Sequence, residues 1–148
     1  MDCLVMCIGN RNGGDDAIGP YISDKLKAFE NKDLVVIDCD ILPENYTSVV
    51  KKYKPKTLII VDAVEMGLKP SEIRIIPASK IGTMHVSTHG IPLSVLMKYL
   101  NEFVEKIILV GVQPREMYGK LTPPVKKSGD KLVEIIRNKE LDEIKTLE

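Results

Sequence analysis

The sequence predicts an α/β domain with three layers, in which helices cover both faces of a mostly parallel five-stranded sheet with one antiparallel strand. Apolar runs of strand length alternate along the chain with segments whose apolar residues have helical spacing. Two runs, Thr57–Val61 and Lys106–Val112, are nearly continuous in apolar residues, as strands are when helices cover both faces of a sheet. The length of 148 residues suits one domain, which we expect to span residues 1–148.

Five strands and four helices follow from these patterns. The predicted strands are Cys3–Ile8, Leu34–Ile37, Thr57–Val61, Glu72–Ile76 and Lys106–Val112. The predicted helices begin at Pro20, Glu44, Ile91 and Gly129, and the last three end at Tyr53, Glu102 and Arg137. Residues 63–71 are too few for a crossover helix, so the fourth strand is predicted to run antiparallel to its neighbour. Lys80–Gly90 and Arg115–Lys127 have no clear period and are predicted to be loops.

The glycine-rich segment Gly9–Pro20 links the first strand to the first helix, where ligands bind in doubly wound sheets. The dinucleotide fingerprint requires glycine at Arg11, and the phosphate loop requires lysine at Asp15, so neither pattern is present. The adjacent carboxylates of Asp15 and Asp16 would also repel a phosphate. The loop therefore favours a cation or a peptide as its ligand.

The start of the first helix bears on the meaning of the two aspartates. Pro20 suits the first helical position, which would make Gly19 the cap and leave both carboxylates outside the helix. A helix that starts near Asp16 would instead use that residue as its cap. Capping accounts for one of the two aspartates and leaves the other, Asp15, unexplained.

Composition limits the kinds of partner. Lysine plus arginine and aspartate plus glutamate both number 21, so neither nucleic acid nor an anionic membrane is an expected partner. The first residues lack the pattern of a signal peptide, and we expect a cytoplasmic monomer. The three cysteines have no framework spacing; Cys3 and Cys7 lie on one face of a strand and are predicted core residues, whereas Cys39 has no predicted role.

Several polar side chains follow strand ends and should share one edge of the sheet. They are Asp15, Asp16, Asp62 and Gln113, with His85 and His89 in a loop that can reach them. Two carboxylates and one imidazole form a three-ligand site of the kind that binds zinc or nickel and leaves a position open. Spacing alone does not choose between the two histidines.

A receiver domain would also carry an acidic pair after its first strand and a phospho-accepting aspartate after its third, where Asp62 stands. Two features count against this alternative. The acidic pair comes six residues after Gly9 rather than at the strand end, and Gln113 follows the last strand where a receiver has a lysine.

Four blocks of sequence resemble a known family, the endopeptidases that mature nickel–iron hydrogenases by removing a C-terminal extension from the large subunit. The blocks are Gly9-Asn10 with Gly14–Pro20, Val61–Ala63, Ser87–Gly90 and Gly111–Pro114, and Lys120–Val125 also resembles the family's last loop. They follow in family order over nearly the whole chain.

The resemblance implies that Asp16, Asp62 and His89 engage nickel already inserted in the large-subunit precursor, or another divalent metal at the same site. It implies cleavage of the precursor as the activity, with the same three residues as the catalytic unit. Two carboxylates could share a proton and activate water, as in aspartic peptidases, although the Asp-Thr/Ser-Gly signature is absent after Asp62. Metal-assisted hydrolysis is the other mechanism, and binding of the precursor without cleavage is a further alternative.

Overall fold

The computed structural model describes residues 1–84 and 90–148 and contains one five-stranded sheet of order β2-β1-β3-β5-β4. The strands are β1 (Cys3–Cys7), β2 (Leu34–Asp38), β3 (Thr57–Ala63), β4 (Ile73–Ile76) and β5 (Lys106–Val112). Four strands are parallel, and β4 pairs antiparallel with β5. The predicted fold class, including the single antiparallel strand, is confirmed.

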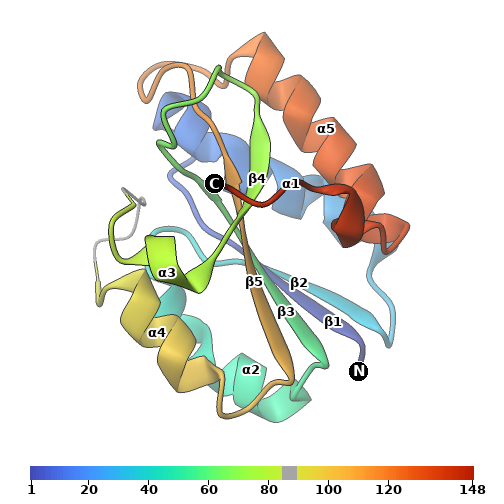
Figure 1. The fold of residues 1–148 in the computed structure, drawn as a ribbon. Helices are drawn as coiled ribbons and strands as arrows, with labels where there is room; N and C mark the ends of the chain where they lie inside the picture. The colour runs from blue at the N-terminus through green and yellow to red at the C-terminus, as the bar shows by residue number, and fades with distance from the viewer. Residues whose placement is uncertain (85–89) are drawn as a thin grey trace.

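Helices form a layer on each side of the sheet (Figure 1). The helices α1 (Ile18–Leu26) and α5 (Pro123–Arg137) pack on one face, and α2 (Thr47–Tyr53), α3 (Ala78–Ile81) and α4 (Leu93–Leu100) pack on the other. Short 3-10 turns complete the chain at η1 (Gly14–Ala17), η2 (Lys27–Phe29), η3 (Pro43–Tyr46) and η4 (Leu141–Glu143). Within the described residues, no helix has the length and hydropathy needed to cross a bilayer.

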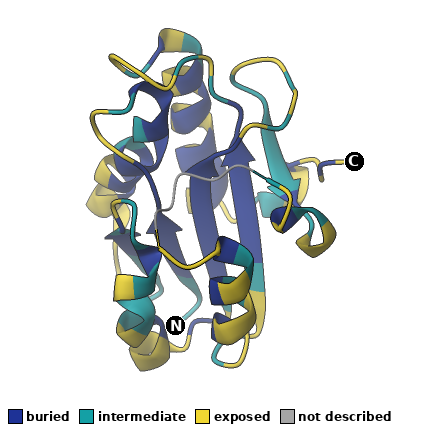
Figure 2. Ribbon diagram, turned by 90° about the vertical axis from the view of Figure 1, so that its left-hand side faces the viewer, coloured by how far each residue is buried: buried dark blue, intermediate teal, exposed yellow. Residues whose placement is uncertain are grey.

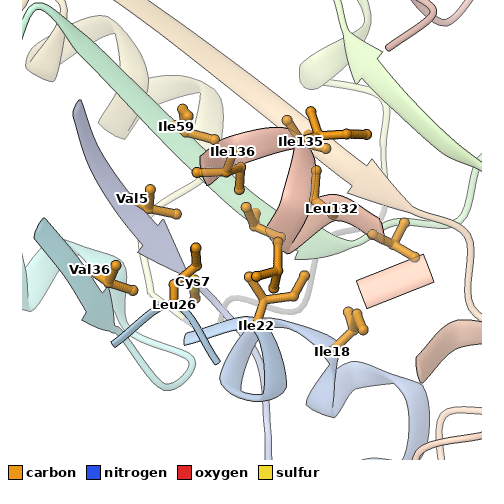
Figure 3. Packing of buried hydrophobic residues seen from close by; sticks show 14 of the residues in the cluster. Val5, Cys7, Ile18, Ile22, Leu26, Val36, Ile59, Leu132, Ile135 and Ile136 are labelled. Carbon is orange, nitrogen blue, oxygen red and sulfur yellow. The ribbon is translucent and has the colours of Figure 1, made fainter. Parts of the chain in front are cut away.

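The two cores follow from the alternation of side chains along the strands. Val5 and Cys7 of β1 point to the α1 and α5 side (Figure 3), whereas Leu4 and Met6 point to the α2 and α4 side. Figure 2 shows buried strands between helices whose outer faces are exposed. Cys7 is fully buried in the first cluster, as predicted, whereas Cys3 is only half-buried and packs against it. Cys39, for which the sequence predicted no role, is fully buried in the second cluster.

The first helix begins earlier than predicted, and neither proposed cap is used. The 3-10 turn η1 leads directly into α1 at Ile18, so Pro20 is the third residue of the helix. Proline is tolerated there because the first-turn amides lack intrahelical acceptors in any case. No side chain caps η1 or α1, so capping explains neither aspartate.

The other boundary errors also involve proline or short elements. The segment predicted as a loop up to Lys127 is helical from Pro123, since two prolines occupy the first two positions of α5. The predicted loop from Lys80 begins within α3, a helix of four residues that is too short to show a period. The helix predicted over Ile91–Glu102 is shorter, because Pro92 precedes its first helical residue.

Candidate active site

The carboxyl ends of β1, β3 and β5 bring the two candidate carboxylates into one region. Turn η1, which carries Asp16, packs against β3, and Asp62 is the last residue but one of that strand. Asp62 lies opposite Gly111 of β5 in the sheet register. Asp62 is fully buried and Asp16 is 5% exposed. Because buried carboxylates are costly to desolvate, their occurrence on adjoining elements makes this region the candidate functional site.

The backbone of the first loop sets the position of Asp16. Its Oδ2 atom accepts a hydrogen bond from the amide of Asn10 at 2.9 Å, and its own amide donates to the carbonyl of Gly13 at 3.1 Å. Gly9 has a φ of 156°, and a Cβ atom there would lie 2.0 Å from the carbonyl oxygen of Asp16. Only glycine allows this approach, so Gly9 is required for the placement of the candidate catalytic turn.

Asp15 has a different environment and a structural role. One carboxylate oxygen accepts from the amides of Arg115 at 2.7 Å and Glu116 at 3.0 Å, and the other accepts from the amide of Thr122 at 2.7 Å. The hydroxyl of Thr122 adds a further hydrogen bond. Burial alone would raise the pKa of Asp15, but the hydrogen bonds from Thr122, Glu116 and Arg115 outweigh it and hold the pKa below the usual value. Asp15 therefore fixes the segment after β5 to the first loop.

Gln113, which directly follows β5, has a comparable structural role. Its Oε1 accepts from the amides of Met66 at 2.7 Å and Leu68 at 3.3 Å, and its Nε2 donates to Glu65 at 2.8 Å. Hydrogen bonds from Gly67 and Gln113 lower the pKa of Glu65, so this carboxylate stays ionised in the pair. The Gln113 amide thus orders the loop that follows β3.

Arg11 holds the first loop to the elements beside it. Its guanidinium forms two hydrogen bonds of 2.8 Å with Asp24 of α1 and one of 2.6 Å with Asp38 of β2. The hydrogen bond from Arg11 lowers the pKa of Asp24. Two carboxylates therefore balance the cationic charge of Arg11, which leaves the loop without the positive field that a phosphate site requires.

Comparison with known proteins decides the family. The profile of a family described as hydrogenase maturation protease matches residues 20–139, more than three quarters of the chain. The chain belongs to the hydrogenase maturation protease family. The matched region includes Asp62 and position 89, and it begins four residues after Asp16.

Individual family members are similar over most of their length. The hydrogenase 3 maturation protease of Escherichia coli K12 is 39% identical over 129 residues, which cover 85% of this chain and 83% of that protein. A putative hydrogenase maturation protease of Methanocaldococcus jannaschii is 38% identical over 140 residues, covering 88% and 83%.

Solved structures of family members share the fold. A crystal structure of the hydrogenase 3 maturation protease has a TM-score of 0.91 at 33% identity and covers 100% of this chain and 97% of that chain. The [NiFe] hydrogenase maturation protease from Thermococcus kodakarensis KOD1 has a TM-score of 0.83 at 30% identity, covering 93% and 90%. As a member of this family, the protein is a peptidase of hydrogenase maturation.

Family membership and topology count against the receiver alternative. Receiver sheets are wholly parallel, whereas β4 of this hydrogenase maturation protease is antiparallel. The receiver alternative is therefore set aside, and this edge of the sheet stays the candidate active site of a peptidase.

The predicted site residues differ in what the structure shows of them. Asp16 and Asp62 lie on adjoining elements, and their roles as ligands and catalysts stay predictions. His85 and His89 lie outside the described residues. Within residues 1–84 and 90–148, no group of three or more histidine, cysteine or acidic side chains is arranged to hold a metal ion. The contacts of Asp15 with Thr122 were not predicted, because residues 107 positions apart leave no local pattern.

Proposed function

We propose that this protein is the endopeptidase that removes the C-terminal extension from the large-subunit precursor of a nickel–iron hydrogenase. The observation that carries the proposal is the pair of buried carboxylates, Asp16 and Asp62, at the carboxyl edge of the sheet in a hydrogenase maturation protease. We further propose that the enzyme is a monomer and acts in the cytoplasm.

The proposed recognition element is nickel that the precursor already carries. Asp16, Asp62 and His89 supply two carboxylates and an imidazole, a donor set that suits nickel and other borderline divalent metals. The nickel belongs to the substrate, so a precursor without it would lack the group that these residues engage. This dependence restricts cleavage to precursors that have been loaded.

The proposed reaction is hydrolysis of one peptide bond. Asp16 or Asp62 accepts a proton from water as the water oxygen adds to the scissile carbonyl carbon. The carbon–nitrogen bond then breaks, and the proton passes to the leaving amine. Precursor-borne nickel next to this bond would polarise the carbonyl. The buried position of both carboxylates excludes bulk water and strengthens their interaction with developing charge.

The test is the intact mass of nickel-loaded precursor after incubation with the protein, with nickel-free precursor as the control. We expect loss of a C-terminal fragment from the loaded form only. The variant Asp16→Asn should abolish this cleavage and still unfold close to the wild-type temperature, because asparagine retains an acceptor for the Asn10 amide. Cleavage by Asp16→Asn at the wild-type rate would refute the assigned role, and binding of precursor without any cleavage would indicate the chaperone alternative.

A further inference from the structure

The segment Arg115–Gly119 leaves β5 at the edge that holds the candidate carboxylates and carries two large apolar side chains into solvent. Met117 is 48% exposed and Tyr118 is 72% exposed, the highest value among the large hydrophobic residues described. A single exposed apolar side chain is ordinary on a protein surface, but two adjacent ones beside a candidate active site suggest a contact surface. We call Arg115–Gly119 the contact loop.

The contact loop is held rigidly despite its exposed side chains. The carboxylate of Asp15 accepts from the amides of Arg115 and Glu116, and the amide of Asp15 donates to the carbonyl of Glu116 at 2.7 Å. The amide of Gly14 donates to the carbonyl of Gly119 at 3.1 Å. Both ends of the loop are therefore fixed to turn η1 before any ligand binds.

Gly14 allows the backbone of the contact loop to lie directly on this turn. Its φ is +63°, and a Cβ atom there would come within 2.5 Å of both the amide nitrogen and the carbonyl oxygen of Tyr118. The loop therefore presents Met117 and Tyr118 from a fixed backbone. A preorganised surface loses little conformational entropy on binding, which favours affinity.

The contact loop lies close to the candidate catalytic residue Asp16, because both are attached to turn η1. Asp15, which holds the loop, is joined to Asp16 by one peptide bond, and both lie in η1. A polypeptide whose scissile bond reaches Asp16 must pass close to this turn. Contacts that bind the substrate and the transition state equally well lower KM without changing kcat.

We infer that Met117 and Tyr118 bind an extended segment of the substrate polypeptide that has apolar side chains next to the scissile bond. The inference rests on the proposed peptidase function and adds the residues that determine its specificity. Tyrosine supplies a large rigid apolar face, and methionine adapts its shape to the partner. The occupant is thus the precursor polypeptide, and the two side chains contribute to KM rather than to the chemical step.

The experiment compares the wild type with the double variant Met117→Ser/Tyr118→Ser and with Tyr53→Ser as a matched control. Tyr53 is 37% exposed at the last residue of α2, which lies toward the opposite edge of the sheet. Cleavage of nickel-loaded precursor is followed by intact mass at several precursor concentrations. We expect a rise in KM of about 10- to 100-fold in the double variant, kcat within about twofold, and Tyr53→Ser equal to wild type.

Direct binding of the same precursor to each protein separates the two proposals. An equal KM and equal affinity for the wild type and the double variant would overturn the role of the contact loop while leaving the peptidase function intact. Wild-type binding without cleavage, with affinity lost in the double variant, would overturn the peptidase function and support the loop. A wild type that neither binds nor cleaves overturns both proposals. Each single variant is measured as well, so that misfolding of the double variant does not obscure the result.

Discussion

Replacement of Asp15 by asparagine should destabilise the protein even though the side chain keeps its size. Asparagine has one acceptor oxygen and one NH2 group, which donates. Either the amides of Arg115 and Glu116 or the amide of Thr122 must then face a donor instead of a carboxylate oxygen. The segment after β5 loses its attachment to the first loop as a result.

The magnitude follows from the number of lost hydrogen bonds. A hydrogen bond to a charged group contributes roughly 1.5–3 kcal/mol, and a buried amide left without an acceptor adds to the cost. Loss on one side of the Asp15 carboxylate therefore lowers the free energy of unfolding by about 3 kcal/mol. For a chain of this size the midpoint of thermal unfolding should fall by roughly 6–12 °C.

The assay is thermal unfolding at neutral pH followed by circular dichroism, with Asp16→Asn as the matched control. The two substitutions are chemically identical and one residue apart, yet we expect the smaller shift of the midpoint for Asp16→Asn, because asparagine retains an acceptor for the Asn10 amide. Loss of stability in Asp15→Asn together with loss of cleavage in Asp16→Asn would assign a structural role to the first residue and a catalytic role to the second. An Asp15→Asn midpoint equal to that of the wild type would refute the structural role assigned to the Asp15 hydrogen bonds.

Three further outcomes are expected. The pKa of Asp15 is lower in the folded state than in the unfolded state. The Asp15 carboxylate therefore stabilises the fold above about pH 4, and this stabilisation is lost as the pH falls through the folded pKa. Thermal unfolding at pH 7, 4 and 3 should show the difference in midpoint between the wild type and Asp15→Asn becoming smaller. Gly19→Ala should lower the free energy of unfolding by about 3 kcal/mol, because the new Cβ would lie 2.1 Å from the carbonyl oxygen of Ile8. Gly82→Ala, where a Cβ would meet nothing within 4 Å, should leave the free energy of unfolding unchanged, and a denaturant titration of both variants checks this pair. Gln113→Glu should lower the free energy of unfolding by about 2 kcal/mol, because the new carboxylate would face that of Glu65. Adding Glu65→Gln to this variant should restore the midpoint of thermal unfolding, and failure to do so would count against the hydrogen bond between residues 65 and 113.

The sheet could be predicted from the sequence because its signals are local. Each strand is an apolar run, and the short link across residues 63–71 does not allow a crossover before β4. The starts of α1 and α5 were misplaced because Pro20 and Pro123 occupy different positions of a first turn, and proline fits more than one of them. The sequence pattern therefore predicts the region in which a helix starts, but not the exact residue at which it starts.

The sequence predicts the region of the candidate site, but it does not predict which of its two adjacent aspartates is structural. Asp15 and Asp16 are adjacent and of the same type, so composition and spacing treat them alike. Their difference comes from contacts with Arg115 and Thr122, about 100 positions away, which exist only after β5 has joined the sheet. Long-range hydrogen bonding therefore separates a residue that stabilises the fold from one proposed to catalyse.

The two buried cysteines, Cys7 and Cys39, can report local unfolding of the protein through their reaction with thiol reagents. Cys7 lies in the core beneath α1 and α5, and Cys39 lies in the core on the opposite face of the sheet. Burial raises the pKa of both thiols, and enclosure keeps alkylating reagents away from them. Modification at either position must therefore await separation of the helices from the sheet. The relative labelling rates of the two thiols would reveal which side of the sheet loosens first and whether the two sides open as one cooperative unit.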